Sequence, residues 1–273
     1  MRMKSKKIVL LMVSILIISL LTIGCKATEE AVTPEDNQEA VEYIEDEVAE
    51  ELKIVASTSW TALMAEAAGA KNVVVLAPVE LKHPPEYDFK PSDVVALQEA
   101  DFIIMAGYEG FMNKMIEANN IDQKKIIKVT TTNTYVNLHE QTHVIADAIG
   151  TQEGQAQWEA EFKKVISKIM KKAQDHNVAE TKVLVHVHMQ AFVKSLGYDV
   201  VAVFGAEELS PAKMGELANM GPDLIIDNYH NPQGMTIAEL ANVERVELRN
   251  FPGPDHSSLI DLFKDNVKLL GLE

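Results

Sequence analysis

With 273 residues, the chain is long enough to form one large hydrophobic core or two small ones. Its formal net charge of −16 disfavours nucleic acid as a partner, because like charges repel, but it is compatible with a cationic ligand. Cys25 is the only cysteine, so the sequence excludes an intramolecular disulfide and any thiol nucleophile downstream of that position.

The start of the chain has the pattern of an export signal. Basic residues at positions 2–7 precede an apolar run over residues 8–23, and a small residue and Cys25 follow. This order predicts a signal peptide at residues 1–24. Residues 21–25, Leu-Thr-Ile-Gly-Cys, resemble a lipobox, so we expect lipidation of Cys25 and anchoring at the extracellular face of the cytoplasmic membrane. A plain signal peptide and a membrane-anchoring helix are the alternatives, and both also export the domain.

An acidic segment separates this signal from the rest of the chain. Residues 25–51 are rich in Glu and Asp and almost without aromatic side chains. Such a composition cannot bury enough apolar surface to offset the entropy of ordering, so we predict a disordered tether.

The remaining residues alternate between short aliphatic runs and segments with helical spacing. The aliphatic runs cover residues 54–56, 73–76, 102–105 and 126–129, and then 183–185, 200–204, 224–226 and 246–248. Segments with helical spacing include residues 61–68, 92–100 and 214–220. Continuous apolar strands that alternate with helices predict an α/β fold with two four-stranded, mainly parallel sheets, each flanked by helices.

One long amphipathic pattern divides the two sets of strands. Trp158, Phe162 and Ile169 recur at helical spacing, and charged residues fill the positions between them. We predict a linking helix at residues 152–177 that joins an N-terminal lobe, residues 52–151, to a C-terminal lobe, residues 178–273.

Histidines concentrate near the predicted strand ends, where ligands bind in parallel α/β sheets. The residues concerned are His83, His139, His143, His186, His188, His230 and His256. Neutral imidazole is a frequent ligand of zinc, manganese and iron. Each histidine alone could be an ordinary loop or core residue, but the distribution on both sides of the linking helix favours a metal site. The sequence Asp-Asn-Tyr-His at 227–230 could hold a metal or merely turn the chain.

Several stretches resemble the solute-binding lipoproteins of zinc and manganese ABC importers, the cluster A-I family. Residues 55–60, Val-Ala-Ser-Thr-Ser-Trp, resemble the first strand and turn of the family. Residues 86–93, Glu-Tyr-Asp-Phe-Lys-Pro-Ser-Asp, resemble its most specific loop. The long helix resembles the connector between the lobes, and residues 260–270 resemble the final helix.

The resemblance implies four metal-ligand positions. His83 is the candidate for the first, His139 or His143 for the second, and His186 or His188 for the third. The fourth position usually holds a carboxylate, where this chain offers Asn250. Asp255, His230 and His256 are possible replacements for it.

The function that the resemblance implies is capture and not catalysis. A monomer would close over one divalent transition metal, zinc before manganese, and deliver it to an ABC permease in the membrane. A second hypothesis keeps the fold and changes the cargo to a chelated metal or a small organic or anionic solute, bound by Tyr87, Tyr108, Tyr229, Asn228 and Asn250. A third is a secreted metal-dependent hydrolase with Asp227 or Glu86 as base.

Overall fold

The computed structural model of the protein describes residues 52–81 and 83–272. These residues all belong to one compact unit, Ala49–Glu273. The predicted signal peptide, the lipidation of Cys25 and the acidic tether therefore lie outside the described residues. Within the described part, none of the helices is both long enough and apolar enough to cross a membrane.

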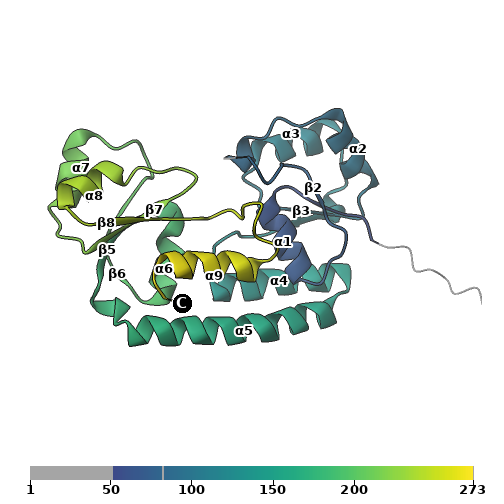
Figure 1. Cartoon of the computed structure of the whole chain (residues 1–273). Helices are drawn as coiled ribbons and strands as arrows, with labels where there is room; N and C mark the ends of the chain where they lie inside the picture. Colours follow the sequence, from purple (N-terminus) through teal and green to yellow (C-terminus); the bar gives the residue numbers. More distant parts are fainter. Residues whose placement is uncertain (1–51, 82, 273) are drawn as a thin grey trace, which may run out of the picture. The chain divides into compact units, whose positions relative to one another are not determined.

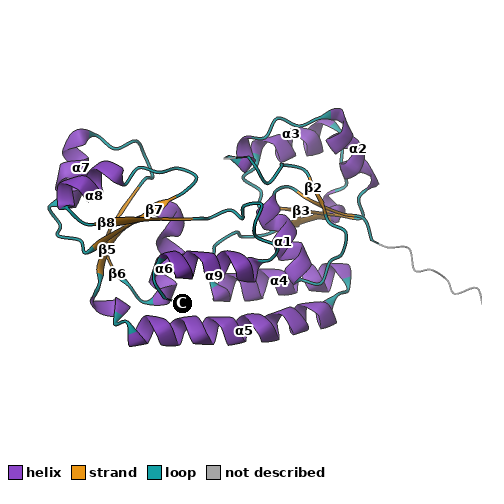
Figure 2. Cartoon of the chain, viewed as in Figure 1, coloured by secondary structure: helices purple, strands orange, loops and turns teal. Residues whose placement is uncertain are grey.

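The first sheet contains four parallel strands in the order β2-β1-β3-β4. They are β1 (Ile54–Ala56), β2 (Val74–Val75), β3 (Phe102–Met105) and β4 (Ile126–Lys128). The helices between them are α1 (Ser59–Ala67), α2 (Pro91–Glu99) and α3 (Gly110–Ala118). Helices lie on both faces of this sheet (Figure 2). Ile103, Ile104 and Met105 in the inner strand β3 are fully buried, as expected for a sheet covered in this way.

The second sheet repeats this arrangement, with four parallel strands in the order β6-β5-β7-β8. They are β5 (Lys182–His186), β6 (Asp199–Phe204), β7 (Leu224–Asn228) and β8 (Glu244–Leu248). The helices between them are α6 (Gln190–Leu196), α7 (Pro211–Ala218) and α8 (Met235–Ala241). The predicted α/β class with two four-stranded sheets is confirmed, and the sheets are wholly parallel.

Three further helices connect the lobes into one body: α4 (Tyr135–Ile149), α5 (Gln152–Asp175) and α9 (Leu259–Leu269) (Figure 1). Short 3-10 turns complete the elements: η1 (Pro84–Glu86), η2 (Gln123–Lys125), η3 (Val178–Glu180) and η4 (Val187–Met189). The long helix was predicted from its pattern, whereas α4 was not. Thr134 caps α4 by accepting a hydrogen bond from the Asn137 N–H, and Gly150 ends it at a φ of 77°.

Helix α5 packs against helices of both lobes. Phe162 on α5 is fully buried, and its ring lies 4.9 Å from Phe263 of α9 and 5.6 Å from Tyr135 of α4. A single hydrophobic cluster runs from Ile54 in β1 to Val267 in α9. Because both lobes share this core, moving one lobe against the other would disturb buried contacts of α5.

Two glycines allow α5 to approach the end of α1. A Cβ on Gly154 would lie 2.9 Å from the Cα of Gly69, which itself adopts a φ of 95°. The Thr151 hydroxyl donates a hydrogen bond of 2.6 Å to the carbonyl oxygen of Ala68 at the same contact. Backbone atoms oppose the missing Cβ, so no side-chain rotation could make room for it.

We therefore expect Gly154→Ala to lower the free energy of unfolding by about 1–3 kcal/mol, the usual cost of overpacking. Gly215→Ala is the matched control, because Gly215 lies inside α7 with nothing within 4 Å of its missing Cβ. That substitution should stabilise the protein by about 0.4–1 kcal/mol through helix propensity and chain entropy. Urea denaturation of both variants measures the difference, and equal effects would contradict the proposed contact.

Candidate functional site

A cleft of about 850 Å³ lies where the strands of both sheets end. Its walls come from the segments that follow the carboxyl ends of β3, β4, β5, β7 and β8, and from α1 and η1. The polar side chains among them include His83, Glu86, Tyr108, His188, Asn228, His230 and Asn250. This is the position at which open parallel sheets bind ligands.

A buried carboxylate shapes the wall of the cleft that belongs to the first sheet. Glu109 is fully buried and accepts hydrogen bonds from the N–H groups of Ala106, at 2.9 Å, and Gly107, at 2.7 Å. The Ser57 hydroxyl, which follows β1, donates a third hydrogen bond of 2.7 Å. These contacts fix the loop after β3, which carries Tyr108 into the cleft.

Asp227, at the end of β7, shapes the wall of the cleft that belongs to the second sheet. Its fully buried carboxylate accepts hydrogen bonds from the N–H groups of Asn228, at 2.8 Å, and Gly234, at 2.6 Å. Arg245 of β8 forms an ion pair of 2.8 Å with the same carboxylate. Residues 228–234, the loop that carries His230, are thereby closed into a turn around one carboxylate. Hydrogen bonds to nearby backbone N–H groups and the ion pair with Arg245 occupy the Asp227 carboxylate, so the structure does not support a role as catalytic base.

Asn250 orients His230 through its amide oxygen. Nδ1 of His230 and Nδ2 of Asn228 both lie 2.9 Å from Oδ1 of Asn250. Since an amide oxygen only accepts, the His230 Nδ1 donates, and the lone pair of the ring is then on Nε2. The Asn228 side chain also accepts from the N–H of His230 at 3.1 Å. Asn250 therefore sets the tautomer and orientation of this imidazole.

The structure divides the predicted metal ligands into separate groups. His83, His188, His230 and Asn250 all line the cleft. His186, His139, His143 and Asp255 are not among the described residues that line it. Asp255 is exposed in the loop between β8 and α9.

His186 and His188 point to different surroundings although they are two residues apart. Strand β5 ends at His186 and the chain continues as η4, so the alternation of a strand does not extend to His188. Nδ1 of His186 accepts a hydrogen bond of 3.2 Å from the His188 N–H. Its Nε2 is buried without a hydrogen-bond partner in the described part of the chain and faces Gly205, where a Cβ would lie 2.2 Å away. Burial, and then the nearby His188, lower the pKa of His186 to about 4.

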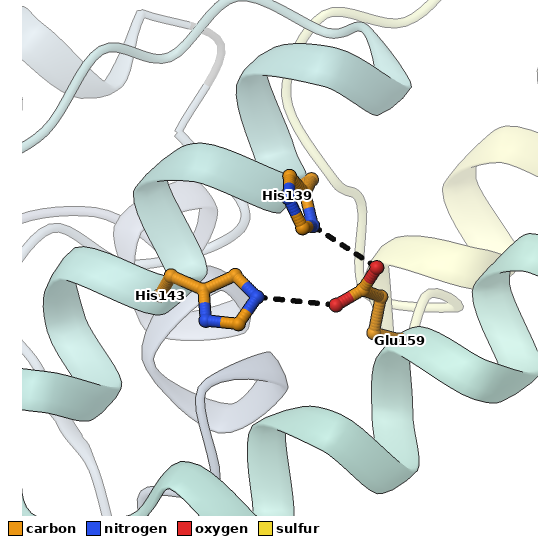
Figure 3. A group of neighbouring side chains, drawn as sticks. All are labelled: His139, His143 and Glu159. Carbon is orange, nitrogen blue, oxygen red and sulfur yellow. Dashed lines mark hydrogen bonds and ion pairs between the residues drawn. The ribbon is translucent and has the colours of Figure 1, made fainter. Parts of the chain in front are cut away.

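His139 and His143 lie on α4 and face Glu159 of α5 (Figure 3). Nδ1 of His139 is 3.0 Å from Oε1 of Glu159, and Nε2 of His143 is 3.2 Å from Oε2. We call these three residues the α4–α5 cluster. The Lys163 ammonium, 2.5 Å from Oε1, together with hydrogen bonds from Gln155 and His143, outweighs burial and lowers the pKa of Glu159 to about 2. The carboxylate is therefore ionised at neutral pH.

Glu159 is the residue of this cluster that the sequence reasoning missed. A signal was present, because residues 139–143 read His-Glu-Gln-Thr-His, the HExxH pattern that places two histidines on one face of a helix. Using it required assigning residues 135–149 to a helix. Glu159 itself resembled any other charge on the polar side of the long amphipathic pattern.

Two parallel α/β lobes that share one core and border a cleft at their strand ends define the architecture of a two-lobed solute-binding protein. Residues 54–148 match the ZnuA family, described as zinc-uptake complex component A, periplasmic. The proteins of this family are non-enzymatic transport components. Comparison with curated protein sequences gives no match.

Solved structures share the fold over nearly their whole length. The solute-binding protein FpvC from P. aeruginosa, in complex with Ni²⁺, is 15% identical, with a TM-score of 0.66 over 81% of this chain and 95% of that one. The AdcAII protein of Streptococcus pneumoniae is 14% identical, with a TM-score of 0.66 over 82% and 99%. The metal-dependent lipoprotein YcdH from Bacillus subtilis is 15% identical, with a TM-score of 0.63 over 80% and 97%. Together with the family match, they confirm the resemblance found in the sequence.

The contacts of Asp227 predict a large effect of its removal on stability. Asp227→Ala should lower the free energy of unfolding by about 3–5 kcal/mol, because it leaves Arg245 without its buried partner and several N–H groups unbonded. Asp255→Ala should change the same quantity by less than about 0.5 kcal/mol, as is usual for an exposed residue. Urea denaturation of both variants tests this, and a mild effect at Asp227 would mean that the loop is held by other contacts.

The buried His186 predicts a loss of stability in acid. Above its usual pKa of 6.5 neither state is protonated, and His186 contributes nothing. As the pH falls from 6.5 toward about 4, the unfolded chain binds a proton that the folded protein does not, so the folded state loses stability. His186→Asn, whose amide oxygen can still accept from His188, should lose less stability over this range. Urea denaturation with chelator at pH 7 and pH 4.5 measures the difference, and parallel losses in both proteins would refute the assignment.

Proposed function

We propose that the protein is the extracytoplasmic solute-binding component of an ABC importer and that it captures one divalent transition metal ion in the cleft. The observation that carries the proposal is that one cleft is lined by His83, His188 and His230, which come from three separate segments of both lobes. Imidazole nitrogens suit zinc and its neighbours better than they suit hard cations, so zinc is the favoured cargo and manganese the next.

The ligands we assign to the ion are these three histidines, with the Glu86 carboxylate as a fourth. Nitrogen and oxygen ligands at roughly 2.0–2.2 Å would satisfy zinc. Desolvation lowers the pKa of His188, which favours the neutral, ligating form of its imidazole. Asn250 acts through His230, in the way that groups beyond the direct ligands commonly orient metal-bound histidines.

The known relatives support metal as the cargo. Solved structures with this fold include proteins bound to Ni²⁺, Zn(II), Cd and Mn. The matched family is named for zinc uptake. We infer that this chain likewise passes its cargo to a membrane permease, as a monomer held by a lipid on Cys25 after removal of residues 1–24.

The size of the cleft favours a second candidate cargo. A volume of about 850 Å³ is far larger than a bare ion needs and falls in the range of pockets for small organic molecules. Tyr108 and the amides of Asn228 and Asn250 offer contacts to such a molecule. A chelated metal would use the histidines and fill the remaining space.

Metal titration of the chelator-stripped protein tests the first proposal. Zinc, manganese, iron(II) and nickel are titrated by calorimetry against the parent protein and the double variant His83→Ala/His230→Ala. The double variant should lose one tight equivalent of the preferred ion. In the parent, a free ion concentration of about a thousand times the dissociation constant should raise the free energy of unfolding by about 4 kcal/mol.

Asn250→Ala separates a positioning role from a ligand role. It should keep the number of bound ions and weaken the affinity roughly 10- to 100-fold, as expected for a group behind a metal-bound histidine. Asp255→Ala is the control and should bind as the parent does. Unchanged binding of every ion by His83→Ala/His230→Ala would refute the cleft as a metal site, and tight binding of a chelate without response to free ions would favour the second cargo.

A further inference from the structure

The α4–α5 cluster is a metal-ligand set that the proposed cargo site does not use. Its two histidines stand four residues apart on α4, and the carboxylate of Glu159 comes from the neighbouring α5. None of these side chains is among the described residues that line the cleft. Two histidines and one carboxylate are a common set of protein ligands for zinc, with a fourth position open to water.

The spacing of the ligand atoms already approaches that of a metal site. One ligand atom from each of His139, His143 and Glu159 can be chosen so that all lie within 4.8 Å of one another. The nitrogen–oxygen distances are 3.0 Å and 3.2 Å, near the edge of roughly 3.3 Å in a tetrahedron with bonds of about 2.05 Å. Distances of this size also fit hydrogen bonds, so they do not decide between the two.

One nitrogen distinguishes the cluster from a satisfied polar network. Nδ1 of His139 is buried and makes no hydrogen bond, although it lies 3.0 Å from Glu159. A buried polar atom without a hydrogen bond costs free energy, and a metal ion would remove that cost. The side chains of His139 and His143 are 39% and 43% exposed, so the cluster borders solvent.

In the structure, the Lys163 ammonium lies beside Glu159, where a metal ion would bind. This ammonium lies 2.5 Å from Oε1 of Glu159, while 59% of the Lys163 side chain is exposed. An exposed lysine can turn away into water at little cost. Tyr135 and Gln155 also donate to the carboxylate, at 3.2 Å and 3.3 Å, and would continue to orient it. A divalent ion and Lys163 therefore compete for one carboxylate.

From these contacts we propose that His139, His143 and Glu159 form a second divalent-metal site, of the zinc class, which is separate from the cleft. An ion bound there links α4 to α5 and so ties the end of the first lobe to the linking helix. Glu140 has no part in the ligand set, because it is exposed and lies off the face that His139 and His143 share. The proposal does not depend on the metal in the cleft.

The test uses zinc calorimetry on the chelator-stripped protein in the His83→Ala/His230→Ala background, which isolates the second site. This background should still bind one equivalent of zinc. Adding His143→Ala should abolish that equivalent, and adding Glu140→Gln, the matched control from the same motif, should leave it unchanged. Retention of the equivalent in His143→Ala, or no zinc binding by the background, would overturn the proposal.

Lys163→Gln gives a second readout in the opposite direction, which loss of folding could not mimic. Removal of the competing ammonium should tighten zinc binding at this site, roughly fivefold for an exposed ion pair. Weaker or unchanged binding would overturn the proposed competition.

The two proposals fail in different ways. If the parent loses its only equivalent through His143→Ala and none through His83→Ala/His230→Ala, the cargo site fails and the second site holds. The reverse result removes the second site and leaves the cargo site.

Discussion

The packing of the Phe162 side chain is the interaction on which the rest of the described structure depends. Its ring meets Phe263 of α9 and Tyr135 of α4, and so joins elements from both lobes to the linking helix in one core. A fully buried aromatic side chain of this size typically contributes about 3–5 kcal/mol, measured as the cost of its truncation to alanine. Helix α5 thus packs against both lobes and also carries Glu159 of the α4–α5 cluster.

In each lobe, a buried carboxylate holds the loop that follows the end of a strand. Glu109 in the first lobe and Asp227 in the second both accept hydrogen bonds from the N–H groups of the loop that follows a strand. A buried charge is tolerated only when it is fully hydrogen-bonded, and here the loop backbone supplies the donors. The side chains that reach the cleft, such as Tyr108 and His230, are thus carried by loops that these hydrogen bonds hold in place without a ligand.

The histidines serve three different purposes in one chain. His83, His188 and His230 face the cleft, where we propose the cargo ion. His186 is a buried residue packed against Gly205, and its lowered pKa follows from that burial. His139 and His143 face Glu159 on the linking helix. The solved structures share the fold, whereas the α4–α5 cluster rests on side chains of this chain alone.

The sequence by itself determined the two parallel sheets and the long helix, because continuous aliphatic runs and a period of 3.6 residues report burial directly. It also indicated His83 through its place beside a specific loop. Only the tertiary structure decided which histidines line the cleft, since strand β5 ends at His186 and His188 lies in the 3-10 turn that follows. Only the tertiary structure distinguished Glu159 from the other charges of its helix, because the two histidines that it contacts lie on α4, which is its neighbour in space and not in sequence.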